Sequence, residues 1–313
     1  MPLFDIGAAI AISFRFFTII YLAGLGGLFS ERSGIVNIGL EGLMIVGTVM
    51  GAWGTVEFGP VPGLLIGMLA GFLYSMVHAI ATVTFKVDHI VSGVVINVVA
   101  IGLARFLSQV FFDQATQSDP GIPQLSKIDI PVLELIPWGL GRAFQGLSPV
   151  IVITFLIAIP AVYVLKRTRF GLRLRAAGEN PEATESLGVR VSPLRYAGVG
   201  ISGALAGLAG AFLAIEVNQL FREGQTQGLG FIALAALILG NWSPGKVMIG
   251  ALLFGLAQAV PLRLADAPVI SLLPPQFIRM IPFIVTIVAI AGFVGRVHPP
   301  ASAGKAYEGR GRL

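Results

Sequence analysis

Few residues of this 313-residue chain stand at spacings that could do covalent chemistry. Gly240 to Lys246 fits the G-x-x-x-x-G-K pattern of a phosphate-binding loop, but Val247 replaces the Ser or Thr whose hydroxyl would hold Mg²⁺. The chain has no cysteine and only three histidines, so thiolate and zinc sites are not expected. The acidic residues suggest no Ser-His-Asp or paired-carboxylate arrangement. We therefore expect no catalytic residue, no metal site and no cofactor.

One long polar segment, 166–195, carries seven Lys or Arg and three Glu. Within it, Asn180 can serve as the N-cap of a short helix whose first residue is Pro181. Glu182 complements the positive end of the helix dipole, and Gly188 ends the helix. This segment is a candidate docking surface for another protein, although a capped surface helix with no partner has the same pattern. The docking residues that we predict are Asn180, Pro181, Glu182, Ala183 and Gly188.

The composition indicates an integral membrane protein of the all-α class. Hydrophobic residues make up 55% of the chain, charged residues only 12%, and the mean hydropathy is +0.86. Soluble domains carry about a quarter charged residues, so this chain does not fit that class. Reading apolar runs of about 17–25 residues as spanning helices predicts about nine. The candidate spans are 7–29, 35–54, 61–85, 90–112, 147–165, 195–216, 229–242, 245–262 and 277–294. The run 229–242 is so short that it is expected to be a broken or partly re-entrant helix.

Loop charges predict the orientation of the chain. If segment 166–195 is cytoplasmic, fourteen Lys and Arg fall on that side and only four on the other, which satisfies the positive-inside rule. The segment 113–146 then becomes an extracytoplasmic loop, the N-terminus lies outside, and 295–313 is a cytoplasmic tail. This topology accounts for the net charge of +5 without nucleic-acid binding. The cytoplasmic basic residues beyond 166–195 are Arg32, Lys86, Lys246, Arg296, Lys305, Arg310 and Arg312.

The two halves of the chain show weak internal similarity. Residues 22–29 match 205–212 at six of eight positions. We therefore expect two four-helix repeats, about 7–112 and about 195–294, joined through a connector helix at 147–165. The predicted topology starts one repeat outside and the other inside, so the repeats are inverted, an arrangement that places a transport pathway at their interface. Chance similarity between apolar, glycine-rich spans is the alternative.

Two polar residues stand at the start of an apolar run. Asn37 and Glu41 lie among glycines, and a polar side chain facing hydrocarbon is unfavourable by a few kcal/mol. We expect both to border a pathway, because glycines allow a helix break whose freed backbone groups can line a cavity. The alternative is that Glu41 pairs with a basic residue such as Arg15 or Arg105 and is purely structural. His78, on an apolar run, is expected to be a packing residue.

The run Gly-Gly-Leu-Phe-Ser-Glu-Arg-Ser-Gly-Ile-Val-Asn-Ile-Gly-Leu-Glu-Gly-Leu-Met at 26–44 resembles permease subunits of ABC importers. The resemblance is to the branched-chain amino acid, ribose and nucleoside group, closest to its nucleoside or simple-sugar branch. Further similar stretches are 178–183, 230–245 and 299–307. Glu182 to Gly188 is similar to the EAA-x-x-x-G motif through which such permeases contact their ATPase, with Thr184 in place of the second Ala.

The resemblance covers nearly the whole chain and implies a single permease domain, 1–313, with a type II-like importer fold. It implies an ABC ATPase subunit that hydrolyses ATP, a second homologous permease forming a heterodimer, and an extracytoplasmic substrate-binding lipoprotein. The chain itself is then no enzyme, and it lies among lipids of the bacterial cytoplasmic (inner) membrane as a multi-pass protein. The expected cargo is a nucleoside, with a ribose-like simple sugar as the alternative. A secondary transporter is less favoured, because such chains usually carry several intramembrane carboxylates and here only Glu41 qualifies clearly.

Overall fold

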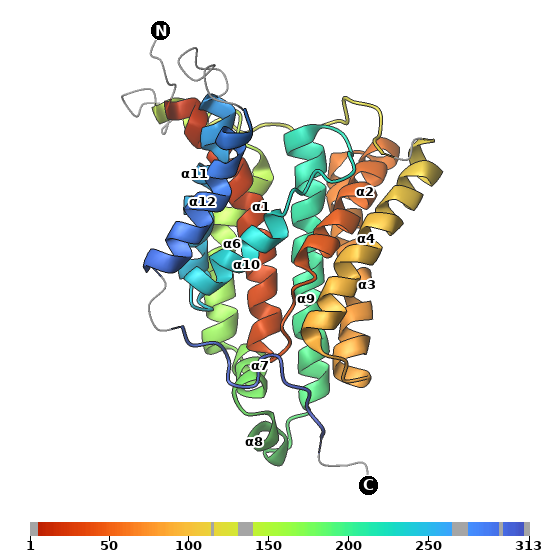
Figure 1. Ribbon diagram of the computed structural model, residues 1–313, viewed down its shortest axis with the longest axis vertical. Coiled ribbons are helices and arrows are strands. Elements are labelled where there is room, and N and C mark those ends of the chain that lie inside the picture. The colour runs from red at the N-terminus through yellow and green to blue at the C-terminus, as the bar shows by residue number, and fades with distance from the viewer. Residues whose placement is uncertain (1–5, 114–115, 131–139, 265–274, 294–296, 310–313) are drawn as a thin grey trace.

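The computed structural model describes a bundle of helices and connecting loops (Figure 1). It covers residues 6–113, 116–130, 140–264, 275–293 and 297–309. Within these ranges no strand longer than an isolated bridge occurs, which confirms the predicted all-helical class. Parts of the predicted loop 113–146 and of the tail 295–313, together with Arg296, Arg310 and Arg312, lie outside the described residues.

The first half of the chain contains four long helices. They are α1 (Ile6–Arg32), α2 (Leu40–Phe58), α3 (Pro60–Ala79), which a π-helical turn extends (Ile80–Thr84), and α4 (His89–Phe112). Local sequence sets their limits. Gly59 makes the turn before α3 with φ of 92°, a conformation that favours glycine, and Pro60 begins the helix. The Asp88 carboxylate caps α4 by accepting from the backbone N–H of Ile90 at 2.9 Å and of Val91 at 3.0 Å.

The second half begins with a short 3-10 turn (Leu140–Phe144). Its helices are α6 (Pro149–Arg167), α7 (Arg169–Glu179), α8 (Pro181–Ser186), α9 (Val191–Phe212), extended by a π-helical segment (Leu213–Asn218), α10 (Leu229–Leu239), α11 (Pro244–Leu264) and α12 (Pro275–Phe293). Helices α7 and α8 are short and lie at one end of the bundle (Figure 1).

Six helices of the described chain are long and apolar enough to cross a membrane. They are Ile6–Arg32, Pro60–Thr84, His89–Phe112, Pro149–Arg167, Val191–Asn218 and Pro244–Arg263. Each of the nine predicted runs coincides with a helix, while the count of nine spans stays a prediction. The run 35–54 differs at its start: residues 34–37 are not helical, Gly34 has φ of 98°, and α2 begins only at Leu40. The run 229–242 contains only the eleven-residue α10.

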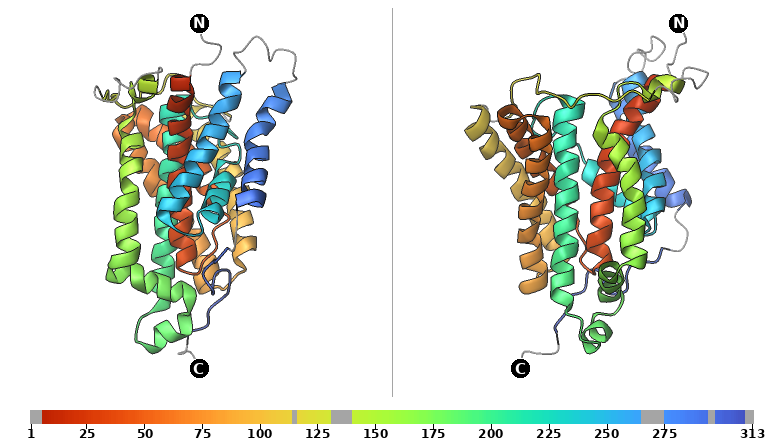
Figure 2. Two further views of the ribbon diagram at one scale, coloured as in Figure 1. Left: turned by 90° about the vertical axis from the view of Figure 1, so that its left-hand side faces the viewer. Right: turned by 180° about the vertical axis from the view of Figure 1, so that it is seen from behind.

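Helices α1 and α9 lie side by side in the middle of the bundle and pack against different partners (Figures 1 and 2). Helix α9 contacts α3 and α2, whereas α1 contacts α11 and α10. Glycine allows the closest of these approaches, because a Cβ placed on Gly207 of α9 would lie 2.4 Å from the carbonyl oxygen of Gly67 in α3. The Gly67/Gly71 and Gly203/Gly207 pairs, each with a spacing of four residues, thus allow α3 and α9 to pack closely.

The two ends of the bundle differ in character. The start of α1 lies at one end, and α7, α8 and the C-terminal segment 297–309 lie at the other (Figures 1 and 2). We call this second group, together with the loop 33–39, the basic end. Between the two ends, α2 and α10 start inside the bundle, and their first turns meet: a Cβ on Gly230 would lie 2.5 Å from the backbone nitrogen of Glu41. We call these first turns, 39–42 and 228–231, the half-helix junction.

Candidate functional site

The short helix α8 has the caps that its sequence predicts. The Asn180 side chain accepts a hydrogen bond from the backbone N–H of Ala183 at 2.9 Å, and Pro181 is the first helical residue. At the other end, Gly188 has φ of 78°, and its N–H donates to the Glu185 carbonyl at 2.9 Å. The predicted cap residues and the stop at Gly188 are therefore confirmed.

Helix α8 presents an outward surface of mixed chemistry. The side chains of Glu182 and Ala183 are exposed, and Leu187 is 84% exposed. Burying a leucine side chain is favourable, so an exposed Leu187 would gain stability from contact with a partner. Thr184 is buried and its hydroxyl donates to the Asn180 carbonyl at 2.7 Å, so this face anchors the helix. An apolar tip beside a carboxylate on a short capped helix is a surface that can enter a groove of a partner protein.

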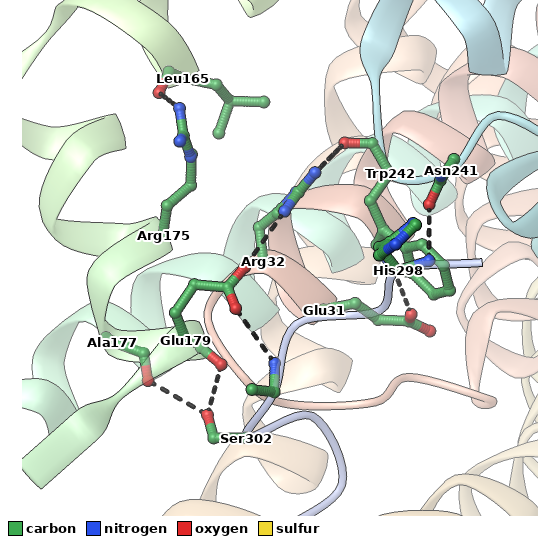
Figure 3. A network of polar contacts seen from close by, with 12 residues as sticks. Glu31, Arg32, Leu165, Arg175, Ala177, Glu179, Asn241, Trp242, His298 and Ser302 are labelled. Carbon is green, nitrogen blue, oxygen red and sulfur yellow. Dashed lines mark hydrogen bonds and ion pairs between the residues drawn. The ribbon is translucent and has the colours of Figure 1, made fainter. Parts of the chain in front are cut away.

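Arg32, the last residue of α1, joins three segments that are far apart in sequence (Figure 3). Its guanidinium donates to the Trp242 carbonyl from Nη2 at 2.8 Å and from Nε at 3.1 Å. It also forms an ion pair with Glu179, the last residue of α7, with 3.5 Å between Nη1 and Oε1. Through this one side chain, α7 is connected to α1 and to the turn between α10 and α11.

The turn between α10 and α11 has an unfavourable backbone that side-chain contacts hold in place. Asn241 and Trp242 have φ of 46° and 51°, in the left-handed region that most residues avoid. The indole N–H of Trp242 donates to the Glu31 carboxylate at 2.6 Å, and both side chains are buried (Figure 3). The Asn241 side chain accepts from the backbone N–H of His298 at 3.0 Å. This turn is therefore fixed to α1 on one side and to the C-terminal segment on the other.

The C-terminal segment crosses the basic end and touches both halves of the chain. The Ser302 hydroxyl donates to the Gly178 carbonyl at 2.6 Å, next to the Glu179 ion pair (Figure 3). Further along, the Gly304 N–H donates to the Gly34 carbonyl at 3.2 Å, in the loop before α2. Tyr307 donates to the Glu185 carboxylate of α8, and burial together with this hydrogen bond raises the pKa of Tyr307 to about 12. The segment thus ties α7 and α8 to the loop that leads into the half-helix junction.

At the half-helix junction, Glu41 of α2 caps α10. Its carboxylate accepts hydrogen bonds from the Thr226 hydroxyl at 2.6 Å and from the backbone N–H groups of Gly228 at 2.9 Å and Gly230 at 2.7 Å. The side chain is 8% exposed, and among the described residues it makes no ion pair. A negative charge here is stabilised by the positive end of the α10 dipole and by free backbone donors. The structural alternative, a pair with Arg15 or Arg105, is not what the structure contains.

Asn37 and Asn97 organise the start of α2. The Asn37 amide donates to the Ser202 hydroxyl of α9 at 2.9 Å, and its carbonyl accepts from the Gly39 N–H at 3.1 Å. Asn97 of α4 accepts from the Gly42 N–H at 2.7 Å. Asn37 is fully buried and does not line either of the two cavities described below. Glu41 lines one of them, so the structure separates the two residues that the sequence grouped.

Two cavities flank the segment 219–228, which leads from α9 into α10. One, of about 510 Å³, lies between this segment and the helices α2 and α4, with Glu41 and Asn97 in its wall. The other, of about 860 Å³, lies between α1, α11 and α12 and is richer in polar groups, including Arg15 and Gln258. Both volumes fall within the range of about 300–1,000 Å³ that small-molecule sites occupy. The larger cavity lies beside the first half of α1, away from the basic end.

Histidine 78 has the packing role that the sequence predicts. It is fully buried, its Nδ1 accepts from the Ser92 hydroxyl at 2.8 Å, and its Nε2 donates to the Val36 carbonyl at 3.2 Å. His89 accepts from the Val36 N–H at 3.2 Å. The two rings therefore hold the backbone N–H and carbonyl of Val36, within the loop before α2.

Sequence reasoning did not identify the Arg32, Glu179 and Trp242 contacts, the C-terminal segment, or the polar segment 219–228. The sequence does show Trp242 before Ser-Pro-Gly, and Glu31 beside Arg32. Nothing in it shows that these two sites, about 210 residues apart, meet. Three glutamines or threonines in a row between apolar runs, at 225–227, were the available signal for a polar wall.

The chain matches the family described as branched-chain amino acid transport system / permease component over residues 9–290. It is 40% identical to the nucleoside ABC transporter permease protein NupC of Lactococcus lactis, over 93% of each chain. It is also 40% identical to the guanosine ABC transporter permease protein NupQ of Bacillus subtilis, over 91% of this chain and 92% of that protein. A protein of Haloferax volcanii that is provisionally named a glucose ABC transporter permease is 34% identical over 90% of each chain. No solved structure matches the chain.

Proposed function

The chain belongs to the permease family of branched-chain amino acid type ABC transporters, and on that premise we propose that it carries nucleosides across the membrane as the permease subunit of an importer. The observation that carries this proposal is 40% identity, over nearly the full length, to two permeases named for nucleosides or guanosine. The 34% identity to a permease named for glucose makes a simple sugar the second candidate.

The proposed topology has nine membrane helices in two inverted repeats, 7–112 and 195–294, with α6 as connector. The packing supports it, because α1 meets α10 and α11 in the way that α9 meets α2 and α3. The start of α1 would lie outside with the loop 113–146, and the basic end would face the cytoplasm. Fusions of a reporter after Lys127 and after Arg175 test this orientation. They should report opposite sides of the membrane, with Arg175 cytoplasmic, and a common side would contradict the topology.

We propose that α8 is the contact for the ATPase subunit that the family implies. The residues involved are Asn180, Pro181, Glu182, Ala183 and Gly188. Support comes from the exposed face of α8 and from its outward position at the basic end (Figures 1 and 2). A displacement of α7 would reach α1 and the turn between α10 and α11 through the side chains of Glu179 and Arg32 (Figure 3).

The pathway is proposed to follow the segment 219–228 and the half-helix junction. Glu41 would border it, as its place in the wall of the smaller cavity supports. Asn37 would act beside the pathway, by holding the loop before α2 to α9 through Ser202. The larger cavity would be entered from the side opposite the basic end, where we expect a substrate-binding lipoprotein. A second, homologous permease would complete a heterodimer.

Uptake by the assembled transporter tests the proposed cargo. The chain, a second permease, the ATPase and the binding lipoprotein from its genomic neighbourhood are reconstituted in proteoliposomes. Labelled inosine, uridine, ribose and leucine are then offered with ATP inside. We expect ATP-dependent uptake of the nucleosides and little uptake of leucine. Uptake of ribose alone would establish the sugar candidate, and uptake of leucine alone would refute both.

A further inference from the structure

The wall between the two cavities contains a buried amide with an unused hydrogen-bond donor. Gln225 lines both cavities and is only 8% exposed. Among the described residues, its Nε2 has no hydrogen-bond partner. A buried NH₂ group without an acceptor is unfavourable, so a fold rarely keeps one without a reason. Its position in a cavity wall indicates a ligand that supplies the acceptor.

A neighbouring residue fixes which way this amide points. Asn218, at the end of the helical segment after α9, donates from Nδ2 to the Gln225 Oε1 at 2.9 Å. Because the oxygen of Gln225 accepts this bond, Nε2 is the polar atom of its side chain that has no partner among the described residues. An amide held in this way offers donors only. It therefore selects an acceptor such as a carbonyl oxygen or a ring nitrogen.

The larger cavity is lined by the charged side chains of Arg15, Arg222 and Glu223 and also by neutral groups that suit a planar polar ligand. Besides Asn218 and Gln225, the amides of Gln227 and Gln258 line it, and all four can exchange hydrogen bonds without carrying charge. The rings of Phe16 and Phe283 supply apolar surface in the same wall. Aromatic faces stack on nucleobases, and side-chain amides pair with base edges. A simple sugar would use the amides but has no aromatic ring to stack on the phenylalanines.

We propose that Gln225 is a specificity-determining residue of a nucleoside site within this chain, in which its Nε2 donates a hydrogen bond to an acceptor on the edge of the base. This inference rests on the proposed nucleoside function and deepens it. It assigns selectivity to the permease itself, in addition to any selectivity of a lipoprotein that delivers the substrate. Asn218 acts through Gln225 as a positioning residue.

Direct binding to the permease complex tests the proposal separately from transport. The complete complex of permeases and ATPase, without the lipoprotein, is placed in nanodiscs and titrated with labelled inosine. Competition with purine riboside, which lacks the 6-oxo group, and with 7-deazainosine, which lacks N7, identifies the acceptor. We expect one of these analogues to bind about tenfold more weakly than inosine.

Two variants and a control complete the test. Gln225→Met keeps the length of the side chain without its donors, and Gln225→Glu keeps the acceptor for Asn218 but replaces the NH₂ group by oxygen. Each should bind inosine about tenfold more weakly than the wild type. Each should also lose the preference for inosine over the analogue that the wild type binds more weakly. Gln109→Met, on an exposed position of α4 outside both cavities, should bind inosine as the wild type does.

The outcomes separate this inference from the proposed function. Uptake of nucleosides by the full transporter, with no inosine binding to the complex or with unchanged discrimination in either Gln225 variant that folds, would overturn the role of Gln225 and leave the function intact. A loss of affinity by the same factor for inosine and both analogues would refute contact with the base. Failure of the wild-type transporter to take up any nucleoside would overturn both.

Discussion

The half-helix junction and the basic end are both polar, but their charges are held in different ways. At the junction, the Glu41 carboxylate is buried and is stabilised by neutral donors, namely one hydroxyl and two backbone N–H groups. At the basic end, Arg32 and Glu179 form an ion pair whose side chains are 20% and 53% exposed. A buried charge with three fixed donors resists rearrangement, whereas a half-exposed pair is weak and can be exchanged for water. The junction is suited to hold a shape, and the basic end is suited to transmit a movement.

Glu41→Ala should have the largest effect, because it removes the acceptor that satisfies the donors at the start of α10. We expect a loss of stability of about 3 kcal/mol or more and no measurable uptake. The measurement is thermal unfolding of the detergent-solubilised chain together with uptake in proteoliposomes. Glu41→Gln, which keeps one oxygen, should have a stability and an uptake between those of the wild type and of Glu41→Ala. An alanine variant with wild-type melting and uptake would contradict the role of this cap.

Gly230→Ala should disturb the same junction by sterics alone. Its Cβ would lie 2.5 Å from the backbone nitrogen and 2.6 Å from the Cα of Glu41, so the two first turns must separate. We expect about 1–3 kcal/mol of destabilisation and impaired uptake. The matched control is Gly102→Ala in α4, where an added Cβ meets no atom of the other described segments within 4 Å, and which should be neutral or slightly stabilising. Equal effects of the two variants would show that the junction tolerates separation.

Glu182→Arg should affect transport while leaving stability almost unchanged. Glu182 is exposed at the first turn of α8, so the substitution reverses the charge offered to a partner and touches no buried group. We expect loss of ATPase co-purification and of uptake, with normal insertion into the membrane. Gly188→Pro should do the same, because proline cannot adopt the φ of 78° that ends α8. Wild-type uptake by both variants would remove α8 from the coupling route.

Arg32→Ala should lower stability by only about 1 kcal/mol and reduce uptake less than the variants above, since its ion pair is partly exposed and screened by salt. If Arg32 transmits the movement of α7, more ATP should be hydrolysed for each nucleoside transported. Arg32→Lys, which keeps the charge but not the paired N–H donors to the Trp242 carbonyl, should restore only part of the coupling. The ratio of ATP hydrolysed to substrate taken up is the measurement, and an unchanged ratio in Arg32→Ala would exclude this route.

Local features of the fold could be predicted from the sequence, and contacts between distant segments could not. The apolar runs predicted the helices, and Asn180, Pro181 and Gly188 predicted the limits of α8, because hydropathy and helix caps act within a few residues. The identity of Glu41 as a special buried carboxylate was also predictable. Its partners Thr226, Gly228 and Gly230 were not, since they depend on how α2 and α10 meet. The same reason explains why the Arg32 contacts and the orientation of Gln225 required the structure.

Cross-linking can show directly which end of the bundle meets the ATPase. The chain has no cysteine, so single cysteines introduced at Leu187 in α8 and, as a control, at Arg142 near the opposite end are the only thiols that it can contribute to a cross-link. In the assembled transporter, Leu187→Cys should cross-link to the ATPase subunit and Arg142→Cys should not. Cross-linking of the ATPase from position 142, or from neither position while uptake remains normal, would contradict the assignment of the basic end as the site where ATP hydrolysis is coupled to transport.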